Sequence, residues 1–322
     1  MFIEILMNIV QQGAAQDVSW IFQIIWVVVL IIIWIYGQRI QTALMLREIE
    51  GSLRRLKFMR DKGRQMAISA IKELGKSSVD LETKVDRILE HVDIEPVTLD
   101  PTGVIRRLEH IIDVREFRLK DEVKQMVPEA DETQINNLTN VLEAAMALNH
   151  IYKVVRHYYL MGKKTLSFYI ILQIQMLLPL IMRESEAFVR ALKAFMLGQP
   201  IGDGAGALVA ARLMHGKPKR IIAPNTIMSE VDIEGRKAYI IKAKGPGGNV
   251  GKPGEAIKQV LEERNGDAAL IIIIDAAQKL EGEKTGEVIE GVGVAIGGPG
   301  VDKYKVEEIA AKYKVPFYAM LI

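Results

Sequence analysis

The sequence predicts an α/β domain at its C-terminal end, preceded by one transmembrane helix and an α-helical region. Three features favour this fold class: an uncharged apolar run near the N-terminus, a long middle region with helical periodicity, and a C-terminal part in which glycine-rich turns separate short apolar runs. We therefore divide the chain into a short segment outside the membrane, a membrane span, a cytoplasmic helical region and an α/β domain, at residues 1–17, 18–37, 38–197 and 198–322.

The apolar run at residues 18–36 predicts the membrane span. It carries no charge, and a helix of about 20 apolar residues crosses a hydrocarbon core of roughly 30 Å. Trp20 lies near one end and Trp34 and Tyr36 near the other, where aromatic rings favour the interfaces. A buried core helix and an uncleaved signal are the alternatives, but a signal carries its positive charge before the apolar run.

Charges around this run predict its orientation. Only Glu4 and Asp17 precede it, whereas basic residues follow it closely: Arg39, Arg47, Arg54, Arg55, Lys57, Arg60, Lys62 and Arg64. The positive-inside rule then places the N-terminus outside and the C-terminus in the cytoplasm, as in a single-pass protein of the cell membrane. The expected partners are the lipid bilayer and anionic lipid head groups. A solvated helix face is the alternative role of the basic cluster.

Overall composition excludes several classes of function. The net charge is only +2 over 322 residues, so no nucleic-acid partner is expected. The chain has no cysteine, which excludes disulfides, thiol catalysis and cysteine-ligated metals.

The helical region reads as successive helices, with breaks at residues 75–78, at 93–101 and near Pro128. No segment alternates apolar and polar residues for long enough to predict a strand. The apolar run 166–182 is nearly long enough to cross a bilayer. Because it contains Gln173, Gln175 and Pro179, we expect a helix buried in the bundle, with membrane insertion as the alternative.

Strands and helices alternate from residue 198 onward. We expect helices at 207–214, 254–264 and 303–314, and strands at 220–226, 238–244, 269–275, 291–297 and 316–322. Such alternation is typical of a mostly parallel sheet with helices on its faces, in Rossmann-like layers. The run 269–275 is apolar almost throughout, as expected of a central strand that is buried on both faces.

A glycine-rich turn between a predicted strand and a predicted helix is the main candidate binding site. Its candidate ligand-binding residues are Gly245, Gly247, Gly248, Gly251 and Lys252. Backbone amides at such a turn, together with the helix N-terminus, can hold an anion. The spacing approaches a dinucleotide-binding fingerprint, in which Asp275 would hold the ribose, but Pro246 and Pro253 depart from a Walker A loop. A tight turn with no ligand is the alternative.

Two further turns and an acidic segment add candidates. Asp203, between two glycines, could ligate a cation, hold a ribose hydroxyl or cap the next helix. The turn at 297–302 is either an anion site or a simple connection. Asp275, Glu281 and Glu283 offer the oxygen ligands that Mg²⁺ prefers, although surface acids interleaved with lysines are the alternative.

Several long motifs also carry a resemblance. They are QMLLPLIM, PIGDGAGALVAARLM, KAKGPGGNVGKPGEAI and LIIIIDAAQKLEGEKTGEVIEGVGVAIGGPG. With the N-terminal apolar run, they resemble an archaeal family of uncharacterised membrane proteins, domain-of-unknown-function family 1512. The resemblance implies an archaeal, membrane-anchored protein with a cytoplasmic C-terminus, and supplies no activity. It also implies a chain that continues slightly beyond Ile322.

These observations predict a single-span, membrane-anchored cytoplasmic protein whose α/β domain binds a nucleotide-like or phosphorylated ligand. Mg²⁺ and a nucleotide are the candidate cofactors. In an enzymatic version, Asp275 with Glu281 or Glu283 would hold the metal and the glycine-rich turn the phosphate, for hydrolysis or phosphoryl transfer. The alternative is a non-enzymatic membrane scaffold or sensor that acts through its helical region, with protein partners or as a homo-oligomer.

Overall fold

The computed structural model describes residues 2–75, 80–92, 103–280 and 282–322. In the first helix, side chains are described for residues 24–31, 36, 37 and from 39 onward. The chain divides into two compact units. The first comprises Met1–Asp61 with Leu148–Ala187, and the second Lys62–Ala147 with Phe188–Ile322.

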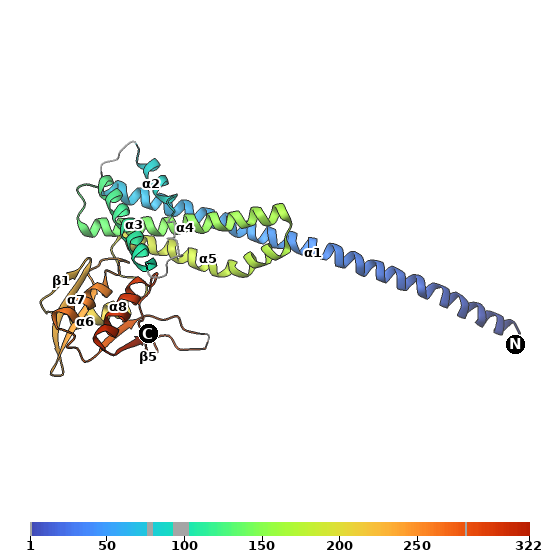
Figure 1. The fold of residues 1–322 in the computed structure, drawn as a ribbon. Coiled ribbons are helices and arrows are strands. Elements are labelled where there is room, and N and C mark those ends of the chain that lie inside the picture. Colours follow the sequence, from blue (N-terminus) through green and yellow to red (C-terminus); the bar gives the residue numbers. More distant parts are fainter. Residues whose placement is uncertain (1, 76–79, 93–102, 281) are drawn as a thin grey trace. The chain divides into compact units, whose positions relative to one another are not determined.

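The predicted helical region is confirmed as a series of helices (Figure 1). They are α1 (Phe2–Leu74), α2 (Leu81–Leu89), α3 (Val104–Met126), α4 (Glu132–Thr165) and α5 (Phe168–Met196). The start of α4 is fixed by a reciprocal cap, because the Gln134 amide N–H donates to Asp131 at 2.7 Å and the Asp131 amide donates to Gln134 at 2.9 Å. This is the geometry of a capping box, which satisfies amides that the first helical turn leaves unpaired.

The first unit packs parts of α1, α4 and α5 around an apolar core. Its fully or almost fully buried side chains include Ile49, Leu56, Leu148, Val155, Ile171, Ile174 and Leu178. Gly162 permits close approach of α4 and α5, since a Cβ there would lie 2.8 Å from the Ile171 side chain. Hydrogen bonds from Gln175 to Glu48 at 2.7 Å and from Arg55 to Glu186 at 2.7 Å join α5 to α1.

The predicted membrane span requires a correction. Residues 18–37 belong to the continuous helix α1, and a spanning helix needs about 20 consecutive apolar residues. Across the side chains that the structure describes, no helix contains a stretch long and apolar enough to cross a membrane. The predictions of a single transmembrane helix and of a single-pass membrane localisation are therefore wrong by this criterion.

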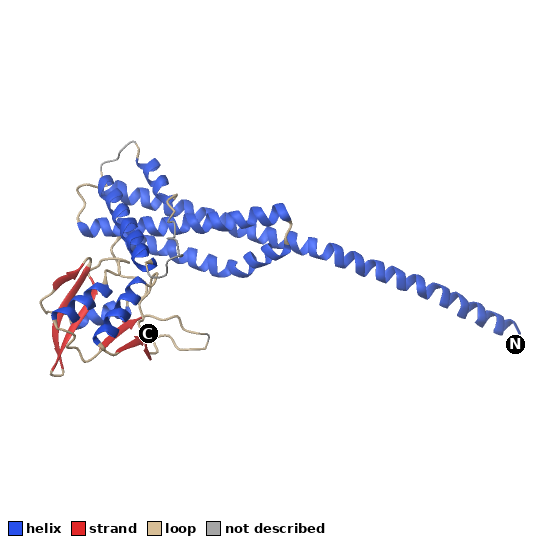
Figure 2. Cartoon of the chain, in the orientation of Figure 1, coloured by secondary structure: helices blue, strands red, loops and turns tan. Residues whose placement is uncertain are grey.

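The C-terminal part contains the strands of the molecule together with three short helices (Figure 2). In chain order these elements are α6 (Ala205–Leu213), β1 (Arg220–Ala223), β2 (Thr226–Ile233), β3 (Arg236–Ala243), α7 (Pro253–Glu263), β4 (Ile271–Asp275), β5 (Ile289–Val292), α8 (Val301–Tyr313) and β6 (Phe317–Leu321). Most of them lie within a few residues of the predicted positions, and Pro253 begins α7 one residue before the predicted start.

The predicted parallel, Rossmann-like sheet is wrong, because the strands form two small sheets. In the first, the order is β1-β2-β3 and both pairings are antiparallel. In the second, the order is β4-β6-β5, with β4 parallel and β5 antiparallel to β6. The hairpin between β2 and β3 accounts for the first of these sheets. Its two turn residues, Glu234 and Gly235, have φ values of 54° and 77°, as in the tight turns that join adjacent antiparallel strands.

Helices α7 and α8 supply the apolar cover of both sheets. Ala256 and Val260 of α7 pack with Ile222 and Met228 of the first sheet. Val306 of α8 packs with Ile273 of the second sheet and with Val294. Strand β4 is an edge strand, and its Ile272 is exposed. The prediction of a central strand buried on both faces is therefore also wrong.

Candidate functional site: a polar cavity beside the glycine-rich turn

The glycine-rich turn between β3 and α7 binds other parts of its own chain through its backbone amides. The Gly248 N–H donates to the Asn140 side chain at 3.3 Å, and the Lys252 N–H donates to the Thr226 hydroxyl at 2.6 Å. The N–H groups of Gly251 and Gly254 donate to Asn249 at 2.8 Å and to Asp302 at 3.1 Å. These are the amides that were expected to face an anion, and side chains of the same protein already accept from them.

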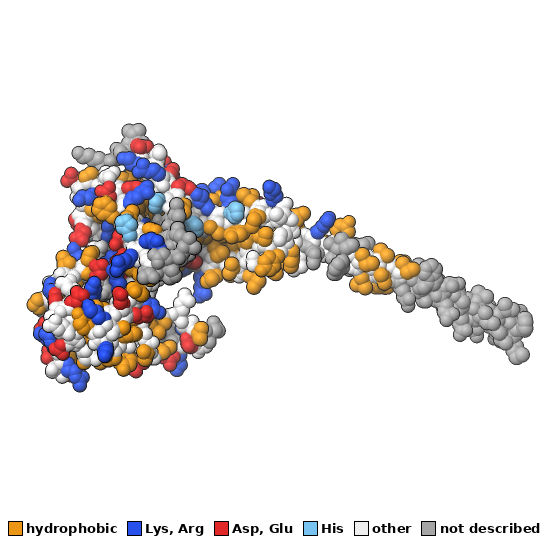
Figure 3. Space-filling model, viewed as in Figure 1, with side chains coloured by type: hydrophobic (Ala, Val, Ile, Leu, Met, Phe, Trp, Pro, Cys, Tyr) orange, Lys and Arg blue, Asp and Glu red, His pale blue; other side chains and the backbone are white. Residues whose placement is uncertain are grey.

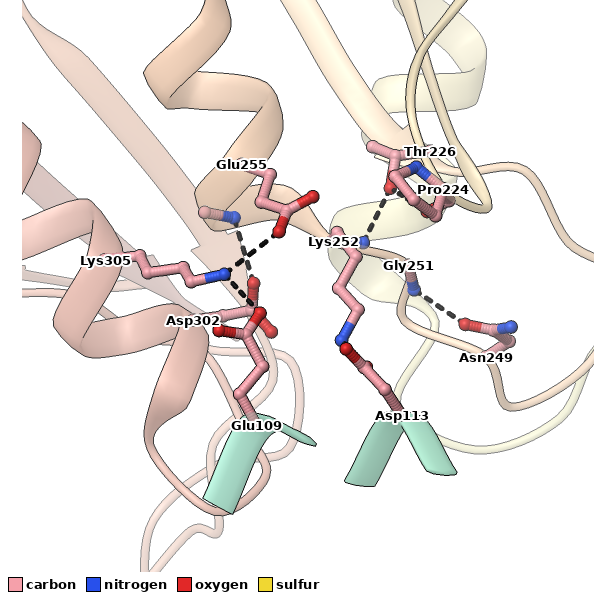
Figure 4. Close-up of polar contacts among 11 residues, drawn as sticks. Glu109, Asp113, Pro224, Thr226, Asn249, Gly251, Lys252, Glu255, Asp302 and Lys305 are labelled. Atoms are coloured by element: carbon pink, nitrogen blue, oxygen red, sulfur yellow. Dashed lines mark hydrogen bonds and ion pairs between the residues drawn. The ribbon is translucent and has the colours of Figure 1, made fainter. Parts of the chain in front are cut away.

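Lysine side chains also link the C-terminal part to α3. Lys252 pairs with Asp113, and Lys305 pairs with both Glu109 and Glu255 (Figure 4). Burial alone would lower the pKa of Lys252, but its hydrogen bond to Asp113 and the nearby acidic charges outweigh burial and raise that pKa above the usual 10.5. The Lys252 side chain therefore remains protonated and forms an ion pair with Asp113 of the same chain.

At two positions of the turn, neighbouring atoms lie so close that only glycine fits. A Cβ at Gly247 would lie 1.9 Å from the Asn140 amide nitrogen, and a Cβ at Gly251 would lie 2.7 Å from the Asn225 carbonyl oxygen. Both residues also have positive φ values, 91° and 70°, which glycine adopts most readily. The close approach at this turn is therefore made by other residues of the protein itself.

The other predicted ligand residues lie in different parts of the structure. Asp203 is exposed, and α6 begins after Gly204 without a side-chain cap. Gly206 lies against the end of β4, since a Cβ there would be 2.0 Å from the Ile274 carbonyl oxygen. Asp275 ends β4 as predicted and accepts a hydrogen bond from the next amide, that of Ala276, at 2.9 Å.

The predicted metal ligands form no recognisable cluster in the described part of the chain. Glu283 accepts a hydrogen bond from the Leu280 amide at 2.6 Å, and Glu281 lies outside the described residues. Among the residues that are described, no group of three or more His, Cys, Asp or Glu side chains could hold a metal ion. The assignment of Asp275, Glu281 and Glu283 to Mg²⁺ stays a prediction.

A polar cavity of about 90 Å³ lies where the glycine-rich turn meets α3 and α4. It has room for several water molecules or one small organic molecule, since a single water needs about 10–15 Å³ measured in this way. The turn contributes one wall, α3 a second and α4 a third. The lining residues are Glu116, Lys120, Asn136, Thr139, Asn140, Glu143, Pro246, Gly248, Asn249 and Val250.

The α4 wall is a stripe of polar side chains. Its four residues recur at positions i, i+3, i+4 and i+7, so they share one helix face. Three of them are buried polar residues, with exposed fractions of 9%, 7% and 8%: Asn136, Thr139 and Asn140. Polar side chains are seldom buried to this extent unless they have hydrogen-bond partners.

Among the residues that the structure describes, two groups on this wall have no such hydrogen-bond partner. Thr139 donates to the Ile135 carbonyl at 2.8 Å, and Asn140 accepts from Gly248. Within the described residues, neither the Asn136 amide nor the Glu143 carboxyl has a hydrogen-bond partner. Burial raises the pKa of Glu143 above its usual 4.5, and Glu116 raises it further, while Arg115 and Lys120 oppose the rise. A perturbed carboxyl in a cavity is a candidate functional group.

Sequence reasoning missed this cavity because it treated α4 only as part of a helical bundle. The available signal was the segment NNLTN at residues 136–140, where three asparagines and a threonine fall within five positions. Such residues are neutral to unfavourable in helix interiors and favour caps and turns. Their presence inside a long helix was therefore a sign of a special environment.

Fold and site together define a two-part protein, in which helices and a small mixed α/β region enclose a polar cavity. Two family models match the chain: the N-terminal domain of a protein of unknown function (DUF1512) at residues 23–198, and the C-terminal domain of unknown function (DUF1512) at residues 201–322. The chain therefore belongs to the DUF1512 family, as the resemblance predicted. No curated protein and no solved structure matches it.

The predicted function of a membrane-anchored, nucleotide-binding protein is corrected by these findings. The described helices include no membrane span, and nothing in the described residues indicates a nucleotide. The turn amides expected to hold phosphate are hydrogen-bonded within the chain. The assignments of Gly245, Gly247, Gly248, Gly251, Lys252, Asp203 and Asp275 to a ligand stay predictions.

Proposed function

We propose that the protein is a non-enzymatic sensor that binds a small organic cation, an amine or a guanidinium compound, in the cavity between α3, α4 and the glycine-rich turn. One observation carries the proposal: Glu143 and Asn136 face the same cavity without hydrogen-bond partners in the described residues. A cation would provide N–H donors for both groups and would favour the charged form of the Glu143 carboxyl.

The charges that line the cavity support this class of ligand. Its ionisable side chains are two glutamates, Glu116 and Glu143, and one lysine, Lys120. When both glutamates are ionised, the lining carries one net negative charge, which one monovalent cation neutralises. An anion would face two carboxylates at short range, and like charges in a partly buried site repel strongly.

The location of the cavity supports a sensing role. Helix α4 and the turn both contribute to its wall, and Asn140 on α4 already binds the turn at Gly248. A ligand that contacts both α4 and the turn would stabilise the contact between these elements, because it binds better when the two lie together. We therefore expect the cation to tighten the association of the helical region with the C-terminal part inside the second unit.

The test compares methylguanidinium with methylurea, which has a similar shape and no charge, on the full chain. We expect a dissociation constant on the order of 1 mM, which corresponds to a binding free energy of about 4 kcal/mol. This free energy lies below the maximum of about 1.5 kcal/mol per non-hydrogen atom that small ligands reach. At about ten times that concentration, mass action adds roughly 1.4 kcal/mol of stability. The temperature of thermal unfolding should therefore rise with the logarithm of the methylguanidinium concentration above the dissociation constant, and remain unchanged with methylurea.

The pH dependence and one variant locate the effect. Because burial raises the pKa of Glu143 above its usual 4.5, its carboxyl takes up a proton at a higher pH than an ordinary glutamate. Binding of the cation should therefore weaken as the pH falls and the Glu143 carboxyl becomes neutral. Glu143→Gln should abolish this rise in unfolding temperature, whereas Glu129→Gln, at an exposed position between α3 and α4, should retain it. A shift that survives in Glu143→Gln, or its absence in the unaltered protein, would refute the proposal.

A further inference from the structure

Helix α3 carries four ionisable side chains in one row, which we call the α3 row. They follow one another at intervals of four, three and four residues, and this spacing places them on the same helix face: Glu109, Asp113, Glu116 and Lys120. The first two form ion pairs with lysines of the C-terminal part, and the last two line the cavity. One face of α3 therefore makes both the ionic contacts with the C-terminal part and a wall of the cavity.

The first two acids of the α3 row each have a cation from the C-terminal part. Lys305 pairs with Glu109 of α3 and also, at 3.1 Å, with Glu255 of α7 (Figure 4). One ammonium group thus joins carboxylates of two helices. Lys252 pairs with Asp113 in the next turn of α3.

Glu116, the third acid of the α3 row, has no such cation. Figure 3 shows acidic and basic side chains interspersed over the C-terminal part on the face drawn, so opposite charges generally lie near one another there. Among the described residues, however, Glu116 forms no hydrogen bond and no ion pair. It shares the cavity with Glu143 of α4, and the two lie close enough that Glu116 raises the pKa of Glu143. A cation between two such carboxylates would favour the charged form of both.

The free acceptors of the cavity match the donors of one chemical group. Each of the two carboxylates offers two oxygens and the Asn136 amide offers one, so together they offer five acceptors. Asn136 is only 9% exposed and has no hydrogen-bond partner in the described residues. A monosubstituted guanidinium has five N–H donors, whereas an alkylammonium has three. An ammonium would therefore leave acceptors in the cavity unpaired, which weakens binding.

We propose that the ligand is a guanidinium compound held between Glu116 of α3 and Glu143 of α4, with Asn136 accepting from the same group. This inference rests on the proposed function and narrows its ligand from organic cations to guanidinium compounds. The bound guanidinium completes the α3 row, because each of the three acids then has a cation. It also joins α3 to α4, as Lys305 joins α3 to α7.

Lys120, the last residue of the α3 row, competes with this ligand. It lies one helical turn after Glu116, and its charge lowers the pKa of Glu143. Among the described residues Lys120 forms no ion pair, so its flexible side chain can turn toward either carboxylate when the cavity is empty. Lys120→Gln should therefore tighten the binding of methylguanidinium about threefold or more, since both carboxylates are then left to the ligand.

Isothermal titration of the full chain with methylguanidinium and with methylammonium tests the assignment. The unaltered protein should bind methylguanidinium about tenfold more tightly than methylammonium. Glu116→Gln should remove most of this preference, because Glu143 and Asn136 already satisfy the three donors of an ammonium. Asp121→Asn, which removes one negative charge from an exposed position of α3, should preserve the preference.

A measurement without ligand checks that the two carboxylates lie close together. Glu116→Gln should lower the pKa of Glu143, followed by NMR, because a like charge has been removed. An unchanged pKa would overturn the inference, since the carboxylates would then lie too far apart to hold one guanidinium. Equal affinity of the unaltered protein for the two ligands would overturn the inference and leave the proposed cation sensor in place, whereas binding of neither ligand would refute both.

Discussion

The turn before α7 and the turn before α8 are both rich in glycine, yet their surroundings differ. In the first, added Cβ atoms at Gly247 and Gly251 would meet Asn140 and Thr226 at 1.9 and 2.4 Å. In the second, Gly298 and Gly300 both have φ values of 91°, but nothing lies within 4 Å of an added Cβ. Glycine in the first turn serves packing as well as conformation, whereas in the second it serves conformation alone.

This difference shows what a glycine-rich motif can and cannot indicate. Both turns follow a strand and open a helix, so the sequence presents both as candidate anion sites. Only the first turn is fixed by side chains from elsewhere, and those contacts occupy its amides. A motif of this kind reports that the backbone needs freedom or space, and it does not report which group fills that space.

The largest expected effect on stability comes from replacing a glycine by alanine in the first turn, compared with the same change in the second turn. Gly251→Ala should lower the free energy of unfolding by about 3 kcal/mol, because the new Cβ meets Asn225 and Thr226 and the residue is held at a φ of 70°. Gly298→Ala should cost only about 1 kcal/mol, from backbone conformation alone. Urea unfolding of the full chain measures both. Equal losses would show that packing at the first turn contributes nothing.

Two glycines at the start of α6 differ in the same way, and their substitution gives the next largest effect on stability. Gly206 and Gly204 are two residues apart at the start of α6, but only Gly206 lies against a neighbour, the Ile274 carbonyl of β4. Gly206→Ala should destabilise the protein by about 2 kcal/mol, because α6 must shift away from β4. Gly204→Ala should remain within about 0.5 kcal/mol. Similar thermal unfolding of the two variants would contradict the close approach of α6 to β4.

The sequence predicted the C-terminal elements better than their arrangement. Strand β4 ends at Asp275 and α8 lies within two residues of its predicted position, because short apolar runs and glycine turns are local signals. Strand β2 was missed, although its residues alternate in burial over part of their length. That omission concealed the hairpin with β3, and a chain of alternating strands and helices then suggested a parallel sheet.

The site was harder to predict because its partners are distant in the sequence. The pairs Asn140 with Gly248 and Asp113 with Lys252 are separated by 108 and 139 positions. Local patterns identified the turn, and they contain no information on which helix packs against it. The Glu143 carboxyl was equally hard to predict, because it is unusual only through its burial beside that turn in the folded chain.

The smallest expected effect distinguishes two ion pairs at the ends of the first turn. Lys252 is mostly buried where it pairs with Asp113, with 16% of its side chain exposed, whereas Lys244 and Glu132 are both well exposed. Solvent screens an exposed pair and leaves it little net value. A double-mutant cycle with Lys252→Met and Asp113→Ala should therefore give a coupling energy of about 1 kcal/mol. The matched cycle with Lys244→Met and Glu132→Ala should give less than about 0.5 kcal/mol, and this smaller coupling should fall further in high salt. If the exposed pair couples as strongly as the buried one, the turn is held by long-range charge attraction rather than by the packed contact at Lys252.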